Sequence, residues 1–477
     1  MQNLWNEIIE KTTGIPQKFN KSLDVVQHME AIEIGTSERD PVWQMDKVRL
    51  FHYRTQNEIK VKTPVLISYA LINRYYMMDL QPDRSLIRKL LSLGLDMYVL
   101  DTGYPTRNER YLTMNDYINV YIDGAVDFIR ESRQIPALNL MGICQGGTFS
   151  VIYSALHPQK IKNLITLVTP VDFSTNDGLL FRWARHMDAD AIVEGFGGLV
   201  PGTFLDMGFQ LLKPMLKVRK QKNLYESVDD EDKLLNFLRM EKWINDLPDQ
   251  AGECYRQFIK DLYQQNKLIK NELVLDGQAV HLKNLTMPAL TIYASEDHLV
   301  PPSSTKPLNE AIGSKDKQLY EFPGGHIGVF TGRRSQAELG PTIFEWLATR
   351  DQSQPVSLPT ETASIPEAQQ RPEKKILSPK PENQGNGIAK TQQSPAPVAE
   401  KADSSPSEVS DDLKKINGIG PTLEEKLHAQ GLRTFAQLAQ LTNAQLEALS
   451  QALGFSLVRL QKLNLAEQAR QLLALSE

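Results

Sequence analysis

The chain has few cysteines, no long apolar run and little net charge, and each shortage excludes a class of protein. Two cysteines among 477 residues cannot build a disulfide framework, so we expect a reducing compartment. No segment approaches the roughly 20 consecutive apolar residues of a transmembrane helix, and the first residues lack the apolar stretch of a signal peptide. A net charge of −5 does not suit a protein that coats nucleic acid. We therefore predict a cytoplasmic protein without a transmembrane segment.

Metal and cofactor motifs are missing as well. His, Cys, Asp and Glu residues do not cluster at metal-ligand spacing. The glycine runs at 195–198 and 385–387 lack the strand–helix frame of a nucleotide-binding loop. We therefore predict no metal and no cofactor. Of the two cysteines, Cys254 lies in a helical pattern and is expected to be a packed structural thiol.

The composition that remains is typical of a globular protein, with 41% apolar and 23% charged residues. A chain of 477 residues exceeds one compact core, so two or three domains are expected. The clearest boundary is the segment 351–410, which is rich in Pro, Gln, Ser, Glu and Lys and has no aromatic residue. Such a segment cannot bury enough surface to offset its chain entropy. It is predicted to be a disordered linker between residues 1–350 and 411–477.

Within residues 1–350, short apolar runs alternate with segments of helical periodicity. The apolar runs are continuous rather than alternating, which is typical of strands buried on both faces. This order predicts a mostly parallel sheet with helices on both faces, the α/β class. The expected strands are 62–71, 96–102, 137–143, 162–171, 288–297 and 317–325, and the expected helices between them are 83–94, 114–133 and 147–158.

The interval from about 174 to 284 interrupts this alternation. It carries large apolar and aromatic residues in helical rather than strand settings. We interpret it as a mainly helical cap inserted over the active edge of the sheet. The alternative is a set of extra peripheral helices without a covering role.

The stretch around Cys144 carries the clearest chemical signal. Residues 142–146, Gly-Ile-Cys-Gln-Gly, have the form glycine–x–nucleophile–x–glycine, which is the strand-to-helix elbow of the α/β-hydrolase fold with Cys in place of Ser. The flanking glycines let strand and helix approach closely, and a helix N-terminus beside the sulfur favours the thiolate. The pattern is short, and a buried structural cysteine is the alternative.

A cysteine nucleophile needs a base, and the base needs a group that orients it. In this architecture the acid and the histidine follow the nucleophile in that order, on loops after later strands. Asp297 ends the strand 288–297, and His326 follows the glycine pair that ends the strand 317–325. His298 competes for the role of base, but it lies beside the acid rather than after a further strand. We predict the triad Cys144, Asp297 and His326.

Two backbone amides are expected to stabilise the oxyanion of the tetrahedral intermediate. The first is the N–H of Gln145, directly after the nucleophile. The second should come from the loop after the strand 62–71, and Ile72 is our choice there.

Sulfur rather than oxygen at the nucleophile position favours one reaction class. If the substrate is a thioester, attack by Cys144 exchanges one thioester for another, so the acyl group stays activated. It can then be passed to a hydroxyl, provided that a cap keeps water out. The residues therefore favour acyl transfer from a thioester over hydrolysis.

The segments 140–173, 69–87, 293–302 and 322–329 resemble the catalytic core of polyhydroxyalkanoate synthases, and are most similar to the class III catalytic subunit. The resemblance implies that Cys144 holds the growing chain and that His326 activates its thiol. It implies that Asp297 assists His326 or helps to deprotonate the 3-hydroxyl of the incoming monomer. The implied substrate is (R)-3-hydroxybutyryl-CoA or another short hydroxyacyl-CoA, and the products are polyester and CoA.

The same resemblance implies a second, non-catalytic subunit of the PhaE type, a homodimer or larger assembly, and a place at the surface of polyester granules. The alternative function is a thioesterase or another hydrolase with the same elbow. A class III catalytic subunit ends near residue 350, so the linker and the last 67 residues are additional.

Residues 411–477 resemble a helix-hairpin-helix domain. Gly418-Ile419-Gly420 would form the tight hairpin, whose amides could hold a phosphate. The expected small core consists of Leu423, Leu427, Leu432, Phe435, Leu438 and Leu441. Contact with the DNA backbone is one interpretation, but seven basic and seven acidic residues give this region no net charge. Protein–protein contact is therefore favoured over DNA contact.

Overall fold

The computed structural model describes residues 32–212, 226–227, 230–351, 410–416, 419, 421–453, 460–461 and 463–474. The predicted linker 351–410 lies outside the described residues except at its two ends. Two of the three residues of the predicted hairpin, Gly418 and Gly420, also lie outside them.

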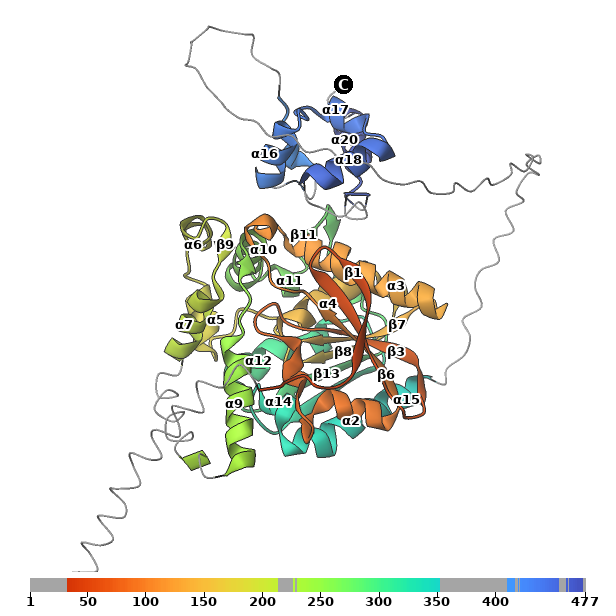
Figure 1. Cartoon of the computed structure of the whole chain (residues 1–477), viewed down its shortest axis with the longest axis vertical. Coiled ribbons are helices and arrows are strands. Elements are labelled where there is room, and N and C mark those ends of the chain that lie inside the picture. The colour runs from red at the N-terminus through yellow and green to blue at the C-terminus, as the bar shows by residue number, and fades with distance from the viewer. Residues whose placement is uncertain are drawn as a thin grey trace, which may run out of the picture. The chain divides into compact units, whose positions relative to one another are not determined.

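An eight-stranded sheet forms the centre of the catalytic region (Figure 1). The strands from β6 onward in the sheet order run parallel, and the first two pair antiparallel. In spatial order they are β1 (Arg39–Met45), β2 (Val48–Tyr53), β6 (Leu95–Asp101), β3 (Val61–Ser68), β7 (Leu138–Ile143), β8 (Ile161–Leu167), β13 (Ala289–Ala294) and β14 (Lys317–Phe322).

All six strands expected from the sequence are present, and the predicted α/β class is confirmed. The hairpin β1–β2 was not predicted. Most of its residues are partly or fully exposed, and only Met45, Val48, Leu50 and Tyr53 are buried, so it lacks the continuous apolar run of the buried strands.

Helices cover both faces of the sheet (Figure 1). Successive residues of β3 show the two faces, since Leu66 packs into one apolar cluster and Ile67 into the other. The cluster around Ile67 includes α2 (Leu86–Leu93), α14 (Gly328–Thr331) and α15 (Gly340–Asp351). The cluster around Leu66 includes the π-helical η4 (Asp116–Ile122), α3 (Asp123–Arg133) and α4 (Gln145–Leu156).

Local signals fix the ends of α2. The side chain of Ser85 accepts a hydrogen bond from the N–H of Arg88 at the N-terminus, and Gly94 ends the helix with φ 101°. A serine N-cap and a left-handed glycine are the residues that helix ends favour. Shorter elements complete this region: η2 (Tyr75–Met78), β4 (Asp79–Gln81), β5 (Arg84–Ser85), η3 (Arg107–Glu109), η5 (Pro158–Lys160), α12 (Pro302–Thr305), α13 (Pro307–Ala311) and η8 (Ser335–Leu339).

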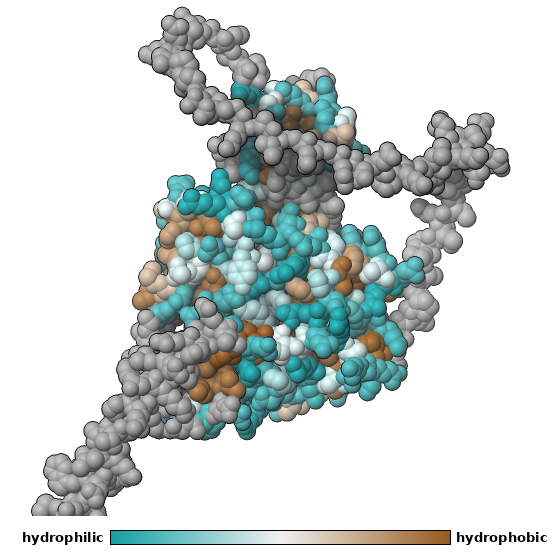
Figure 2. Space-filling view, viewed as in Figure 1, coloured by the Kyte–Doolittle hydropathy of each residue, from teal (hydrophilic) through white to brown (hydrophobic). Residues whose placement is uncertain are grey.

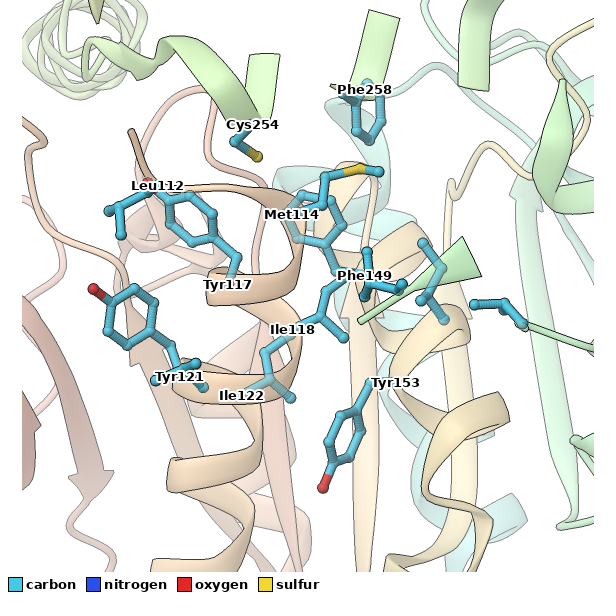
Figure 3. Close-up of a cluster of buried hydrophobic side chains, with 14 of the residues drawn as sticks. Leu112, Met114, Tyr117, Ile118, Tyr121, Ile122, Phe149, Tyr153, Cys254 and Phe258 are labelled. Carbon is cyan, nitrogen blue, oxygen red and sulfur yellow. The ribbon is translucent and has the colours of Figure 1, made fainter. Parts of the chain in front are cut away.

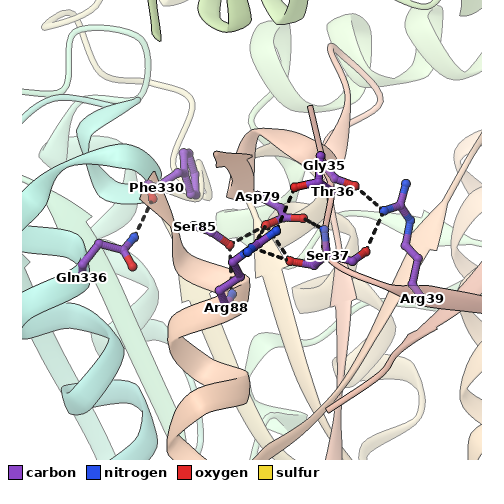
Figure 4. Close-up of polar contacts among 9 residues, drawn as sticks. All are labelled: Gly35, Thr36, Ser37, Arg39, Asp79, Ser85, Arg88, Phe330 and Gln336. Carbon is purple, nitrogen blue, oxygen red and sulfur yellow. Dashed lines mark hydrogen bonds and ion pairs between the residues drawn. The ribbon is translucent and has the colours of Figure 1, made fainter. Parts of the chain in front are cut away.

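The buried carboxylate of Asp79 connects the segment around Ser37 to the start of α2 (Figure 4). Asp79 is 1% exposed. Its oxygens accept hydrogen bonds from the N–H and hydroxyl of Ser37, both at 2.8 Å, and from the hydroxyl of Ser85 at 2.6 Å. Because a buried charge is tolerated only when its hydrogen bonds are satisfied, this cluster fixes the segment around Ser37 against α2.

The interval 174–284 is mainly helical, as expected. Its helices are α5 (Leu179–Ala184), α6 (Ala189–Gly195), α7 (Gly202–Leu212), α9 (Glu231–Asn245), α10 (Gly252–Gln257), the π-helical η6 (Phe258–Gln264), α11 (Lys267–Lys270) and η7 (Leu282–Asn284). Two short antiparallel pairs interrupt them, β9 (Leu199–Val200) with β10 (Gln250–Ala251) and β11 (Val274–Leu275) with β12 (Gln278–Ala279).

Aromatic side chains join this interval to the helix after the nucleophile (Figure 3). The ring of Phe258 on η6 meets that of Phe149 on α4 edge to face at 5.9 Å, and Phe149 stacks with Tyr117 at 6.3 Å. Each such buried side chain contributes about 1.5–3 kcal/mol. Cys254 lies in the same cluster, and burial raises the pKa of its thiol. It is a packed structural cysteine, as expected.

The C-terminal residues form short helices: η9 (Leu413–Lys415), α16 (Pro421–Ala429), α17 (Phe435–Ala439), α18 (Asn443–Leu453) and α20 (Leu465–Ala474). Of the expected core, Leu423, Leu427, Leu438 and Phe435 are buried, and Leu432 and Leu441 are partly buried. Thr434 and Gln437 form a capping box at the start of α17. The described residues of this region are therefore all-α.

The surface of the catalytic region is mostly hydrophilic on the face that Figure 2 shows, with apolar patches separated by polar residues. None of the helices in the described ranges is both long and apolar enough to cross a membrane.

Candidate active site

Cys144 stands at a strained corner between β7 and α4. Its backbone has φ 53° and ψ −123°, a conformation that residues with a side chain rarely adopt. Such strain costs about 1–3 kcal/mol and persists only where the surroundings enforce it. Here the N–H of Cys144 donates to the carbonyl of Leu167 on β8 at 2.9 Å, and its carbonyl accepts from the N–H of Thr148 at 3.2 Å. The thiol is partly exposed, as a nucleophile requires.

The glycines around the corner are required by close packing. A Cβ at Gly142 would lie 2.5 Å from the Cα of Gly147, where strand and helix meet. A Cβ at Gly146 would clash with the carbonyl oxygens of Ser68 and Tyr69 at the end of β3. The elbow therefore lies directly against the strand that leads into the predicted oxyanion loop.

The structure brings the predicted acid and base together. Asp297, in the turn after β13, has its Oδ2 2.6 Å from Nδ1 of His326, which follows β14. The other oxygen of Asp297 accepts hydrogen bonds from the N–H groups of Leu299 and Val300, both at 2.9 Å. The carboxylate is fully buried and fixed by three partners. His298, the competing histidine, is exposed.

The pKa of His326 depends on both Asp297 and Cys144. Burial lowers the pKa of His326, but the charge of Asp297 and its hydrogen bond to the ring outweigh that effect. A hydrogen bond with Cys144 and its charge act in the same direction, so the pKa of His326 rises from 6.5 to about 10. The imidazolium form of His326 is therefore favoured, which places a positive charge beside the sulfur of Cys144.

The predicted oxyanion donors have no protein partner among the described residues. Within the described part of the chain, the N–H groups of Gln145 and Ile72 donate to no protein acceptor. A further link was not predicted. The side-chain Oε1 of Gln145 accepts a hydrogen bond from the N–H of Leu71 at 3.0 Å, and the side-chain Nε2 of Gln250 donates to the carbonyl of Leu71 at 3.1 Å.

Two buried tyrosines near the sulfur were also missed from the sequence. Burial and then the charge of Cys144 raise the pKa of Tyr69, after β3, and of Tyr263, on η6. Both phenols therefore stay neutral, and both lie close enough to Cys144 to interact electrostatically with its sulfur. The position of Tyr69 at the end of a predicted strand could have indicated it, whereas no sequence signal indicated Tyr263.

Among the residues that the structure describes, no group of three His, Cys, Asp or Glu side chains could hold a metal ion. The residues that the structure brings together at the candidate site supply a thiol, an imidazole and a carboxylate. This arrangement can perform nucleophilic acyl transfer through a covalent thioester.

Comparison with known protein families agrees with the fold. Residues 63–333 match the family model of the alpha/beta hydrolase fold, which covers more than half of the chain. The protein is thus an α/β-hydrolase-fold protein with cysteine at the nucleophile position. A second model, the N-terminus of poly-beta-hydroxybutyrate polymerase, matches residues 3–90.

Individual relatives give a narrower assignment. The poly(3-hydroxyalkanoate) polymerase subunit PhaC of Allochromatium vinosum is 46% identical over 348 residues, which is 72% of this chain and 98% of that protein. The subunit of the same name from Synechocystis is 45% identical, over 72% of this chain and 93% of that protein. The chain belongs to the family of poly(3-hydroxyalkanoate) polymerase subunits PhaC. The predicted family is confirmed, and the protein is an enzyme.

The match to one relative continues into the C-terminal region. The PhaC subunit of Haloarcula marismortui is 35% identical over 455 residues, covering 93% of this chain and 94% of that protein. A match of that extent must continue beyond residue 350. Residues 413–473 separately match the RS2/RL21/YNQ2 helix-hairpin-helix model.

Proposed function

We propose that this polymerase joins short (R)-3-hydroxyacyl groups, mainly 3-hydroxybutyryl, from their CoA thioesters into a polyester held covalently on Cys144. The observation that carries the proposal is the buried Asp297–His326 pair at 2.6 Å, which lies beside the strained cysteine of a PhaC-family chain.

The first half of the reaction loads the enzyme. Because Nδ1 of His326 is bonded to Asp297, Nε2 is the nitrogen available to take the thiol proton of Cys144. The thiolate attacks the thioester carbonyl, the bond between that carbon and the CoA sulfur breaks, and the imidazolium returns the proton to CoA. The N–H groups of Gln145 and Ile72 are the proposed donors to the oxyanion.

The second half lengthens the chain. The hydroxyl of another hydroxyacyl-CoA gives its proton to His326 and attacks the acyl group on Cys144. The new C–O bond forms as the C–S bond to Cys144 breaks, so the chain grows by one unit and ends in CoA. Transfer of this chain back to Cys144 releases CoA. Because both oxygens of Asp297 are engaged by backbone amides and His326, its arrangement supports an orienting role.

The cap is proposed to keep water from the acyl-enzyme. The edge-to-face contact of Phe258 with Phe149 and the pair Phe173–Tyr263, whose ring centroids are 4.8 Å apart, support an apolar covering beside the elbow. Without such a covering, water would compete with the hydroxyl and the enzyme would act as a thioesterase, which is the alternative function.

Incubation with (R)-3-hydroxybutyryl-CoA separates the two functions. We expect CoA release with formation of polymer that is extracted into chloroform, and loss of both in Cys144→Ala. Release of only free hydroxy acid, even with a second synthase subunit added, would refute polymerisation. Unchanged CoA release in Cys144→Ala would refute Cys144 as the nucleophile.

The wider organisation is also a proposal. It comprises a catalytic domain 1–350 with a cap at about 174–284, a linker 351–410 and a helix-hairpin-helix-like domain 411–477. The two family matches, which end at residue 333 and begin at residue 413, support it. We further propose a PhaE-type second subunit, a homodimer or larger assembly, and cytoplasmic work at the surface of polyester granules.

The C-terminal domain is proposed to bind protein rather than DNA, because it has no net charge. A gel-shift titration of the full chain with duplex DNA at several salt concentrations tests this. Salt-dependent binding that disappears when residues 411–477 are removed would favour DNA.

A further inference from the structure

Two glutamines hold the peptide groups on either side of Leu71. Gln145 accepts from the N–H of Leu71 at 3.0 Å, and Gln250 donates to the carbonyl of Leu71 at 3.1 Å. All three residues are buried. Backbone groups decide which end of each amide faces them, so Gln145 acts as the acceptor and Gln250 as the donor.

The bond from Gln250 fixes the direction of a neighbouring N–H group. The carbonyl of Leu71 and the N–H of Ile72 belong to one planar trans peptide group and point in opposite directions. Holding the carbonyl toward Gln250 therefore directs the N–H of Ile72 to the other side of the loop. That N–H is the one with no protein acceptor in the described chain.

Gln250 belongs to the cap, whereas Ile72 belongs to the loop after β3. Gln250 lies on β10, pairs with Val200 on β9, and its Nε2 also donates to the carbonyls of Pro248 at 3.1 Å and Asp249 at 3.5 Å. A second contact joins the same two parts of the chain: the indole N–H of Trp243 donates to the carbonyl of Arg74 at 2.8 Å.

We propose that Gln250 is a positioning residue for catalysis, which orients the Leu71–Ile72 peptide group so that its N–H can serve the oxyanion. The side chain of Gln145 supports the same loop by accepting from the N–H of Leu71. The backbone N–H of Gln145 is the other proposed donor to the oxyanion. The inference rests on the proposed function, because it assigns Ile72 to the oxyanion of that reaction. Because Gln250 belongs to the cap, the oxyanion hole is complete only when the cap is in contact with the loop after β3.

Replacement of Gln250 by Met keeps the length of the side chain and removes the donor. The matched control is Gln264→Met, because Gln264 lies in the same cap and its Nε2 donates to the carbonyl of Met187 at 2.7 Å. Loss of a whole oxyanion donor costs about 10²–10³-fold in kcat. A misdirected one should cost about 10–100-fold in kcat for CoA release from (R)-3-hydroxybutyryl-CoA, with KM changed less than about threefold.

Alkylation of Cys144 by iodoacetamide supplies the second readout, because this displacement forms no oxyanion. We expect Gln250→Met to leave the alkylation rate at the wild-type value while kcat falls, and Gln264→Met to change neither. If Gln250→Met does not fold, Gln145→Met tests the same loop from the other side and should show the same pair of results.

Wild-type kcat in folded Gln250→Met would overturn the inference while leaving the proposed function intact. Equal loss of kcat and of alkylation would also overturn it, because the triad rather than the oxyanion site would then depend on Gln250. Retained CoA release in Cys144→Ala would overturn the proposed function and this inference together.

Discussion

At the residue scale, we expect the reactivity of the Cys144 sulfur to depend on whether the neighbouring His326 is protonated. Asp297 is buried and bonded to two backbone N–H groups as well as to the ring, so its position beside His326 is fixed. The charge and hydrogen bond of Asp297, together with smaller contributions from Cys144, raise the pKa of His326 to about 10 against the effect of burial. At neutral pH the ring of His326 therefore keeps its proton beside the sulfur of Cys144.

Replacement of Asp297 by Asn should remove this effect. The pKa of His326 should fall, because burial alone lowers it. The imidazolium is then lost at lower pH, and the neutral thiol–imidazole pair is favoured. The iodoacetamide alkylation rate of Cys144 at pH 7 should fall about tenfold, as expected for a pKa change of one unit or more, and the midpoint of its pH profile should move upward.

The control for this measurement is Asp172→Asn, because Asp172 lies in the catalytic region and is bonded to Asn266 rather than to His326. Its alkylation profile should match that of the wild type. A profile in Asp297→Asn that does not differ from the wild-type profile would show that the carboxylate does not control the charge of His326.

At the scale of elements, the strand–turn–helix from β7 to α4 depends on close approach to β3. The elbow could be recognised in the sequence because a Cβ at residue 142 or 146 would clash. Both positions therefore require glycine, and the two glycines form the motif. The six buried strands were predictable for a similar reason, since burial on both faces leaves a continuous apolar run. The hairpin β1–β2 was not, because its partly exposed residues weaken the pattern.

Gly146→Ala tests the close approach. The added Cβ would clash with backbone oxygens of Ser68 and Tyr69, which cannot move away as a flexible side chain could. We expect a loss of about 1–3 kcal/mol in the free energy of unfolding, the usual cost of overpacking, measured by urea denaturation. The control is Gly195→Ala on α6, where a Cβ meets nothing within 4 Å. An unchanged stability in Gly146→Ala would contradict the packing argument.

At the scale of the whole molecule, the meeting of Asp297 with His326 could be predicted because parallel strands bring their carboxyl ends to one edge of the sheet. Asp297 and His326 follow adjacent strands β13 and β14, so order along the chain was enough to place them. Contacts from the cap could not be predicted in this way. The path of residues 174–284 follows no repeating pattern, so the approach of Gln250 to Leu71 and of Tyr263 to the sulfur emerged only in three dimensions.

The C-terminal region shows what sequence alone can establish about a separate part of the chain. Its helices and small core follow from leucine spacing and capping residues such as Thr434. Its role does not follow from them, because a balanced charge fits several kinds of partner. Its presence within the match to the Haloarcula marismortui subunit indicates that this family accommodates the region.

The most direct test of the account is to find the acyl group on the enzyme. The protein is mixed with (R)-3-hydroxybutyryl-CoA, quenched in acid within the first turnover, digested and examined by mass spectrometry. We predict that the peptide containing Cys144 gains one or more hydroxybutyryl units, that neutral hydroxylamine removes them, and that Cys144→Ala gains none. Rapid CoA release with an unmodified Cys144, or with the acyl group on another residue, would contradict the account.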